Sequence, residues 1–86
     1  MTGDDVRDAR GRLGPMWGLG RRLHMSELGR ALRLQGRDPG QSVRDWERGK
    51  TSVSGPASVA IELLLAGAMP PDPIDQIITR TELDPK

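Results

Sequence analysis

The chain is almost without aromatic residues, which restricts the kind of core that it can build. Among 86 residues there is no Phe and no Tyr, and the two aromatic side chains are Trp17 and Trp46. The hydrophobic fraction of 35% therefore consists mainly of Leu, Ile, Val, Met and Ala. Because aromatic residues are enriched in strands, this composition favours helices over a sheet. A chain of this length forms one small domain, so we expect a single all-α domain over residues 1–86 without a deep catalytic cleft.

The sequence also argues against several classes of protein. It contains no Cys, which excludes disulfides, thiolate zinc sites and a cysteine nucleophile and leaves no sign of an oxidising compartment. No apolar run approaches the roughly 18 residues of a membrane span. The first eight residues carry three Asp, the wrong sign for a signal peptide. We therefore expect a soluble, unprocessed cytoplasmic protein.

Charge is distributed unevenly along the chain. The formal net charge is only +1, from 13 basic and 12 acidic residues. Residues 9–50 hold ten basic and four acidic residues, a net charge of +6, whereas residues 1–8 carry −2 and residues 51–86 carry −3. Of the basic residues 11 are Arg, whose planar guanidinium suits phosphate oxygens and guanine edges. An ordinary solvated surface is one explanation of this pattern, and the one we favour is a basic DNA-facing surface with acidic segments on the opposite side.

The N-terminal part predicts one helix followed by an ambiguous segment. Apolar residues recur on one side of residues 4–13, and Gly14-Pro15 is expected to end this helix. Residues 16–23 contain two glycines and form either a short weak helix or an ordered loop. Trp17 in this segment is interpreted as a packing residue, since one isolated aromatic makes no stacking surface for bases.

Two short helices with a turn between them are predicted in the basic middle of the chain. Residues 26–34 have Leu28 and Leu32 on one side and an arginine stripe, Arg30 and Arg33, on the other. Residues 35–39 form a turn, in which Asp38 is the expected N-cap and Pro39 the first residue of the next helix.

This next helix, 39–48, is predicted to turn Val43 and Trp46 inward and to end at Gly49, a left-handed C-cap. Its outward side chains are polar: Gln41, Ser42, Arg44, Asp45 and Arg48.

Two more helices are predicted towards the C-terminus. Gly55-Pro56 opens an apolar helix that ends at Gly67, and a helix with apolar residues on more than one face needs cover on more than one face. Asp72-Pro73 caps a short helix over 73–81. Its isoleucines either form a subunit contact or dock back on the domain. The candidate dimer-interface residues of these two helices are Leu64, Ile74, Ile77 and Ile78.

Two short helices joined by a turn, the second with a polar outer face, match the helix-turn-helix pattern. The first helix of such a unit needs a very small residue where the helices cross, and Gly29 stands there. Side chains on the outer face of the second helix can bond base edges, and Gln41, Arg44 and Asp45 suit adenine, guanine and cytosine respectively.

Residues 27–32, ELGRAL, and 43–50, VRDWERGK, carry a resemblance to a known family. The first segment is similar to the "ELARLL" helix, and the second to the "VxxWExGK" helix end, of the phage repressor and Cro-like (XRE-type) helix-turn-helix family. Residues 55–57 and 63–65 resemble the helix that follows in many small members, so the resemblance covers about residues 21–67. It implies a lambda-repressor-like bundle of about five short helices. The helix-turn-helix core would consist of Leu28, Gly29, Leu32, Val43, Trp46 and Glu47.

The resemblance also implies functional roles. Gln41, Arg44 and Asp45 would read bases, and phosphate contacts would come from Ser42, Arg48, Lys50, Thr51 and Ser52. Glu47 would be structural, a partly buried acid paired with an arginine from the N-terminal part.

The chain departs from the family pattern in two places. Leu32 and Val43 are eleven positions apart, against about seven in the family, so the turn is longer and Arg37 becomes a further candidate for phosphate or base contact. The glycine-rich stretch before residue 24 replaces the family's regular first helix or extends its loop.

No constellation for catalysis stands out, so we expect no enzyme. His24 is the only His, no Ser lies in a nucleophile-elbow context, and no carboxylates have metal-ligand spacing around it. His24 is therefore interpreted as a helix-end or surface residue. We expect no metal, cofactor or small-molecule ligand.

These patterns favour a DNA-binding transcriptional regulator of a phage or mobile element, acting near the nucleoid. A homodimeric (auto)repressor would bind an inverted-repeat operator in double-stranded DNA through the major groove. The alternative is a protein-binding helix-turn-helix module, an antitoxin or a phage-encoded inhibitor of a host protein. Its contacts would include the acidic residues Asp72, Asp75, Glu82 and Asp84.

Overall fold

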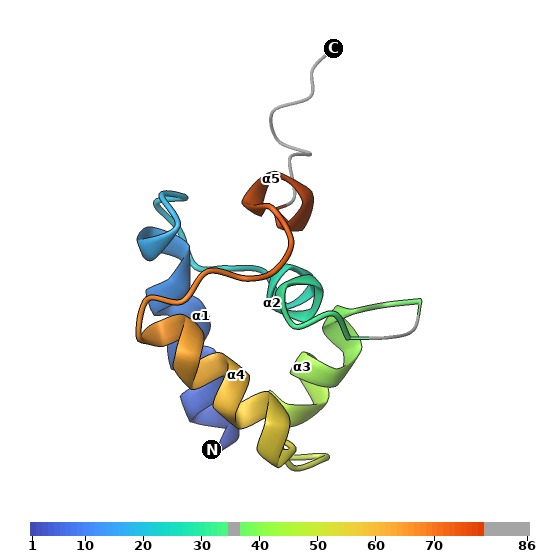
Figure 1. The fold of residues 1–86 in the computed structure, drawn as a ribbon. Coiled ribbons are helices and arrows are strands. Elements are labelled where there is room, and N and C mark those ends of the chain that lie inside the picture. The colour runs from blue at the N-terminus through green and yellow to red at the C-terminus, as the bar shows by residue number, and fades with distance from the viewer. Residues whose placement is uncertain (35–36, 79–86) are drawn as a thin grey trace.

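The structure is a computed structural model, which describes residues 1–34 and 37–78. These ranges form five helices and no strand: α1 (Gly3–Met16), α2 (Met25–Ala31), α3 (Gly40–Glu47), α4 (Gly55–Leu65) and α5 (Ile74–Ile77) (Figure 1). The expected all-α fold is confirmed. No helix in the described ranges has the length and apolar character needed to cross a membrane.

The helices enclose one aliphatic core. α1 lies beside α4 and also contacts α3, α2 packs on α3, and α5 contacts α2 (Figure 1). The core is aliphatic except for one indole, in agreement with the composition. Its buried members are Val6, Ala9, Leu13, Leu23, Leu28, Ala31, Val43, Trp46, Ile61, Leu64 and Ile77.

α1 is longer than the sequence predicts. It begins with a capping box, in which the Thr2 hydroxyl accepts from Asp5 N and the Asp5 carboxylate accepts from Thr2 N. It continues to Met16, so the expected end at residue 13 is wrong. Gly14 does not end the helix: a Cβ there would overlap the backbone carbonyl of Arg21, so this glycine permits the close approach of the returning chain. Pro15 is accommodated in the last turn.

The glycine-rich segment after α1 is an ordered loop, which settles the alternative left open by the sequence. Gly18 and Gly20 have positive φ values of 80° and 69°, a conformation that glycine adopts without steric cost. Trp17 is half-buried against the core, as expected for a packing residue.

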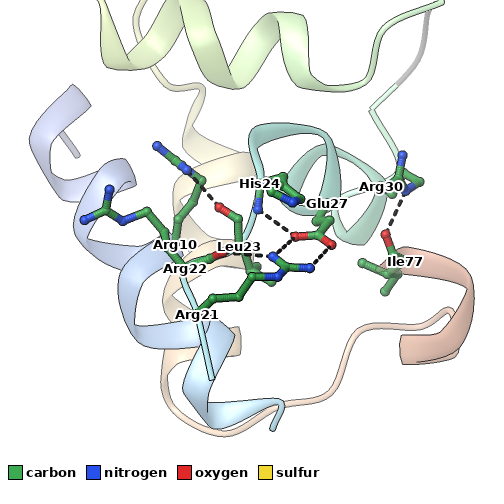
Figure 2. Close-up of polar contacts among 8 residues, drawn as sticks. All are labelled: Arg10, Arg21, Arg22, Leu23, His24, Glu27, Arg30 and Ile77. Carbon is green, nitrogen blue, oxygen red and sulfur yellow. Dashed lines mark hydrogen bonds and ion pairs between the residues drawn. The ribbon is translucent and has the colours of Figure 1, made fainter. Parts of the chain in front are cut away.

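α2 is shorter than predicted and carries no arginine stripe. It ends at Ala31 rather than residue 34, and Arg33 takes a left-handed φ of 56°. Instead of lining one helix face, both arginines hold the C-terminal segment. Arg30 Nε donates to the carbonyl of Ile77 at 2.8 Å (Figure 2), and Arg33 donates to both carboxylate oxygens of Asp72 at 2.8 and 3.0 Å. Ile77 lies 47 residues after Arg30, and Asp72 lies 39 residues after Arg33. Local sequence patterns do not predict contacts between residues so far apart.

The bond from Arg33 also lowers the pKa of the Asp72 carboxyl below its usual value. A carboxyl with a depressed pKa stabilises the fold above its ordinary pKa, and this contribution is lost as the pH falls through the lowered value. The docking of α5 is therefore favoured at neutral pH and weakened in strong acid.

The C-terminal isoleucines dock back on the domain. α5 spans only Ile74–Ile77 within the described residues, and positions 79–81 of the predicted helix 73–81 lie outside them. Ile77 is 1% exposed and Leu64 is 5% exposed, so these two residues belong to the protomer core. Their assignment to a dimer interface is wrong, while Ile74 and Ile78 stay half-buried.

α2 and α3 cross at very short range because glycines stand on both helices. A Cβ at Gly29 would overlap the backbone carbonyl of Pro39, and one at Gly40 would lie 2.9 Å from the Ser26 nitrogen. The sequence-based role of Gly29 as the small residue at the crossing is confirmed. The two backbones are in direct contact at the crossing, so a side chain at Gly29 or Gly40 would push α2 and α3 apart.

Substituting Gly29→Ala tests this crossing. We expect a loss of about 1–3 kcal/mol or more of unfolding free energy, because the new methyl meets fixed backbone rather than a flexible side chain. Gly55→Ala is the matched control, since Gly55 is exposed with open space around its Cβ position. Urea unfolding followed by circular dichroism measures both variants, and equal midpoints for the two would contradict the close crossing.

Candidate nucleic-acid interface

Asp38 holds the start of α3. Its Oδ1 accepts a hydrogen bond from Gly40 N at 3.0 Å, and its backbone carbonyl accepts from Gln41 N at 3.0 Å. The predicted N-cap is wrong by one residue: the N-cap of α3 is Pro39, without a side-chain capping bond, and the helix begins at Gly40. Asp38 instead precedes the N-cap and bonds the first helical amide. At the other end Gly49 has a φ of 77° and donates to the carbonyl of Trp46, so the predicted left-handed C-cap is confirmed.

The inner side of α3 is held by packing and by one buried ion pair. Val43 is fully buried and Trp46 is 7% exposed, as predicted. The Glu47 carboxylate accepts two hydrogen bonds from Arg10 of α1, at 2.6 and 2.8 Å, and both side chains are 9% exposed. The predicted partnership between Glu47 and an N-terminal arginine is confirmed. Arg10 also donates to the carbonyl of Leu23 at 2.8 Å (Figure 2). Together with its bonds to Glu47, this contact joins α1, α3 and the loop before α2.

A second buried carboxylate anchors the start of α2, and sequence reasoning missed it. Glu27 is fully buried and accepts two bonds of 2.8 Å from Arg21 and one of 2.6 Å from His24 N (Figure 2). The spacing from His24 to Glu27 is that of a capping box, the one local signal that could have indicated this role. His24 is an exposed helix-end residue, as expected.

The three predicted base-reading residues lie together on the outer face of α3 and are linked to one another. Arg44 Nη1 donates to Gln41 Oε1 at 2.8 Å, and Gln41 Nε2 donates to Asp45 Oδ1 at 3.0 Å. Arg44 Nη1 also lies 3.5 Å from Asp38 Oδ2. The structure thus brings the predicted residues into one surface network, which we call the α3 network: Asp38, Gln41, Arg44 and Asp45.

Three exposed cations flank this network and are available to contact a ligand. Arg37 precedes α3, whereas Arg48 and Lys50 follow it, and all three are exposed. None of them makes an ion pair with any residue in the part of the chain that the structure describes. The remaining predicted phosphate contacts lie nearby: Ser42 is half-buried on α3, and Thr51 and Ser52 are exposed directly after Lys50.

The basic middle of the chain is only partly a basic surface. Four of its arginines hold the fold together: Arg10 and Arg21 form carboxylate pairs within the domain, and Arg30 and Arg33 hold the C-terminal segment. The pairs of Arg10 and Arg21 do not change the local net charge of +6, because Glu47 and Glu27 are already subtracted in it. Asp72 lies outside this range, so its pair with Arg33 offsets one further positive charge. The available positive charge near α3 comes from Arg37, Arg48 and Lys50.

The other surfaces of the described residues contain little that suggests chemistry. They include no group of three or more His, Asp or Glu side chains placed to hold a metal ion. An apolar groove of about 250 Å³ runs between the end of α2 and α4. Its lining residues are Ala31, Leu32, Arg33, Ala60, Leu63, Leu64, Ala68, Met69 and Pro71.

Comparisons with protein-family models, with curated proteins and with solved structures find no match to this chain.

Breaking the Arg10–Glu47 pair from one side is expected to cost about 3–5 kcal/mol of unfolding free energy, because one buried charge loses its partner. Arg10→Met and Glu47→Met test each side, and the double variant should recover part of the loss, since it leaves no unpaired charge. Arg12→Met is the control: Arg12 pairs with Asp8 at 3.7 Å on the exposed face of α1, and its loss should cost less than about 1 kcal/mol. Additive losses in the double variant would contradict a coupled buried pair.

Proposed function

We propose that this chain is a sequence-specific DNA-binding regulator that reads the major groove with α3. The observation that carries the proposal is the outer face of α3. Donors and acceptors suited to base edges, on Gln41, Arg44 and Asp45, form one surface network. It is flanked by the exposed cations Arg37, Arg48 and Lys50. Because base contacts specify the sequence and phosphate contacts fix the register, a reading face needs both kinds of group side by side.

The α2–α3 pair supports a helix-turn-helix mode of docking. In this mode the first helix lies across the second and the outer face of the second enters the groove. The glycine crossing holds α3 against α2, and the buried Arg10–Glu47 pair holds it against α1, so little conformational entropy is lost on binding. We assign phosphate contacts to Ser42, Arg48, Lys50, Thr51 and Ser52, and to Arg37 in the long connection between the helices.

The proposed regulator acts as a homodimer on an inverted repeat, with half-site centres about 10 bp apart, and represses by occupying a promoter. One helix with about three base contacts discriminates poorly, and a second copy on a symmetric site roughly doubles the discrimination. Since Leu64 and Ile77 are buried, a subunit contact would use apolar side chains that stay exposed. Val59 and Leu63 on α4 and Met69 beyond it are 58%, 56% and 64% exposed.

One observation favours a second candidate function, a protein-binding module. The apolar groove between α2 and α4 is lined by no residue of the α3 network and could receive a partner's side chains. Binding in such a groove is driven mainly by apolar contact, so it depends only weakly on salt. Binding to DNA is strongly salt-dependent, which separates the two candidates.

Fluorescence anisotropy with a labelled pool of random-sequence 30-bp duplexes tests the proposal. Log affinity should fall linearly with log salt, with a slope of about 0.9 per neutralised phosphate. Arg48→Gln and Lys50→Gln should each weaken binding and reduce this slope by about one. At saturation of a duplex selected from the pool, we expect two bound chains.

Arg7→Gln is the matched control, because Arg7 is an exposed cation on α1 and its substitution removes the same charge. A flat salt response would support the protein-binding candidate instead. An equal loss of affinity in Arg7→Gln would show that binding follows total charge rather than α3.

A further inference from the structure

Asp38 uses its two carboxylate oxygens for different purposes. Oδ1 accepts from Gly40 N, the first amide of α3, whereas Oδ2 lies 3.5 Å from Arg44 Nη1. The bond to Gly40 N holds the carboxylate at the start of the helix. Oδ2 consequently stays at a set position next to the guanidinium, and both side chains keep solvent access, with Arg44 34% exposed and Asp38 51% exposed.

The remaining bonds of the α3 network fix the orientation of the Gln41 amide. Its oxygen accepts from Arg44, and its nitrogen donates to Asp45. A glutamine recognises adenine by offering its oxygen and its nitrogen together. Gln41 would therefore have to break both contacts before it could read adenine in this way.

The same network leaves the groups suited to a G·C pair available. The Arg44 contacts within the described residues all use Nη1, so Nε and Nη2 can still donate side by side to O6 and N7 of guanine. Asp45 accepts from Gln41 through Oδ1, and Oδ2 can accept from the amino group of cytosine. As it stands, the α3 network favours guanine and cytosine over adenine.

We propose that Asp38 is a specificity-determining residue, which positions Arg44 to read guanine and opposes binding to phosphates alone. This inference rests on the proposed DNA-binding function. A carboxylate beside the reading arginine is repelled by the DNA backbone unless Arg44 gains a compensating base contact, so unrelated sequences are disfavoured. Asp38 acts through Arg44 and needs no contact with a base.

Asp38→Asn tests the proposal, because the Asn side-chain oxygen can accept the same bond from Gly40 N and only the charge is removed. Selection from a random duplex pool should give wild-type sites with a guanine whose replacement by adenine lowers affinity about tenfold. For Asp38→Asn we expect this discrimination to shrink to about twofold or less, while affinity for the unselected pool rises about three- to tenfold. Asp8→Asn is the matched control, since Asp8 also pairs with an arginine on an exposed helix face.

The outcomes separate this inference from the proposed function. If the wild type binds no duplex, the proposed function fails. If it binds, but Asp38→Asn keeps full discrimination and unchanged affinity for the pool, only the role of Asp38 is overturned. Selected sites without a guanine, or equal effects of Asp8→Asn, overturn it as well. Asp38→Ser, whose hydroxyl is a second uncharged acceptor, provides the same comparison if the Asn variant does not fold.

Discussion

The bonds that Arg10 makes are the constraint on which the rest of the structure depends. One guanidinium on α1 holds the Glu47 carboxylate at the end of α3 and the carbonyl of Leu23 before α2. It ties together three segments that an aliphatic core of this size would fix only loosely, because Leu, Ile and Val side chains pack without directional bonds. A buried pair of this kind adds little net stability but strongly disfavours arrangements that leave either charge alone. The Arg10–Glu47 pair therefore favours this position of α3 over positions that would separate the two charges.

The remaining charges of the chain divide between holding α2 in place and forming a surface. Glu27 anchors the start of α2 through Arg21, and Arg30 and Arg33 at its end hold α5 and the segment before it. With Gly29 and Gly40 at the crossing, α2 and α3 form a pair with little freedom. Arg37, Arg48 and Lys50 are left beside the α3 network, which is where a DNA-binding function would need positive charge.

Local signals in the sequence predicted much of this arrangement. The C-cap at Gly49, the inward Val43 and Trp46 and the crossing at Gly29 are confirmed. The arginine partner of Glu47, which the family resemblance implies, is confirmed as well. The predicted N-cap of α3 is one residue off. The other errors arise from contacts between segments that fold back on one another, most of them far apart in the sequence. Arg30 and Arg33 bond the C-terminal segment, Gly14 accommodates the backbone of Arg21, and Ile77 enters the core. None of these contacts produces a periodic pattern in the sequence. The roles of the outer α3 side chains stay predictions, because they concern a partner rather than the fold.

Amide chemical shifts of the ¹⁵N-labelled protein, recorded with and without a duplex selected from a random pool, test the central claim most directly. If α3 reads DNA, the largest changes fall on residues 41–52 and on Arg37, and the exposed face of α1 changes little. Changes confined to α4 and the apolar groove, with residues 41–52 unaffected, or no changes with a duplex in excess, would contradict a DNA-reading role for α3.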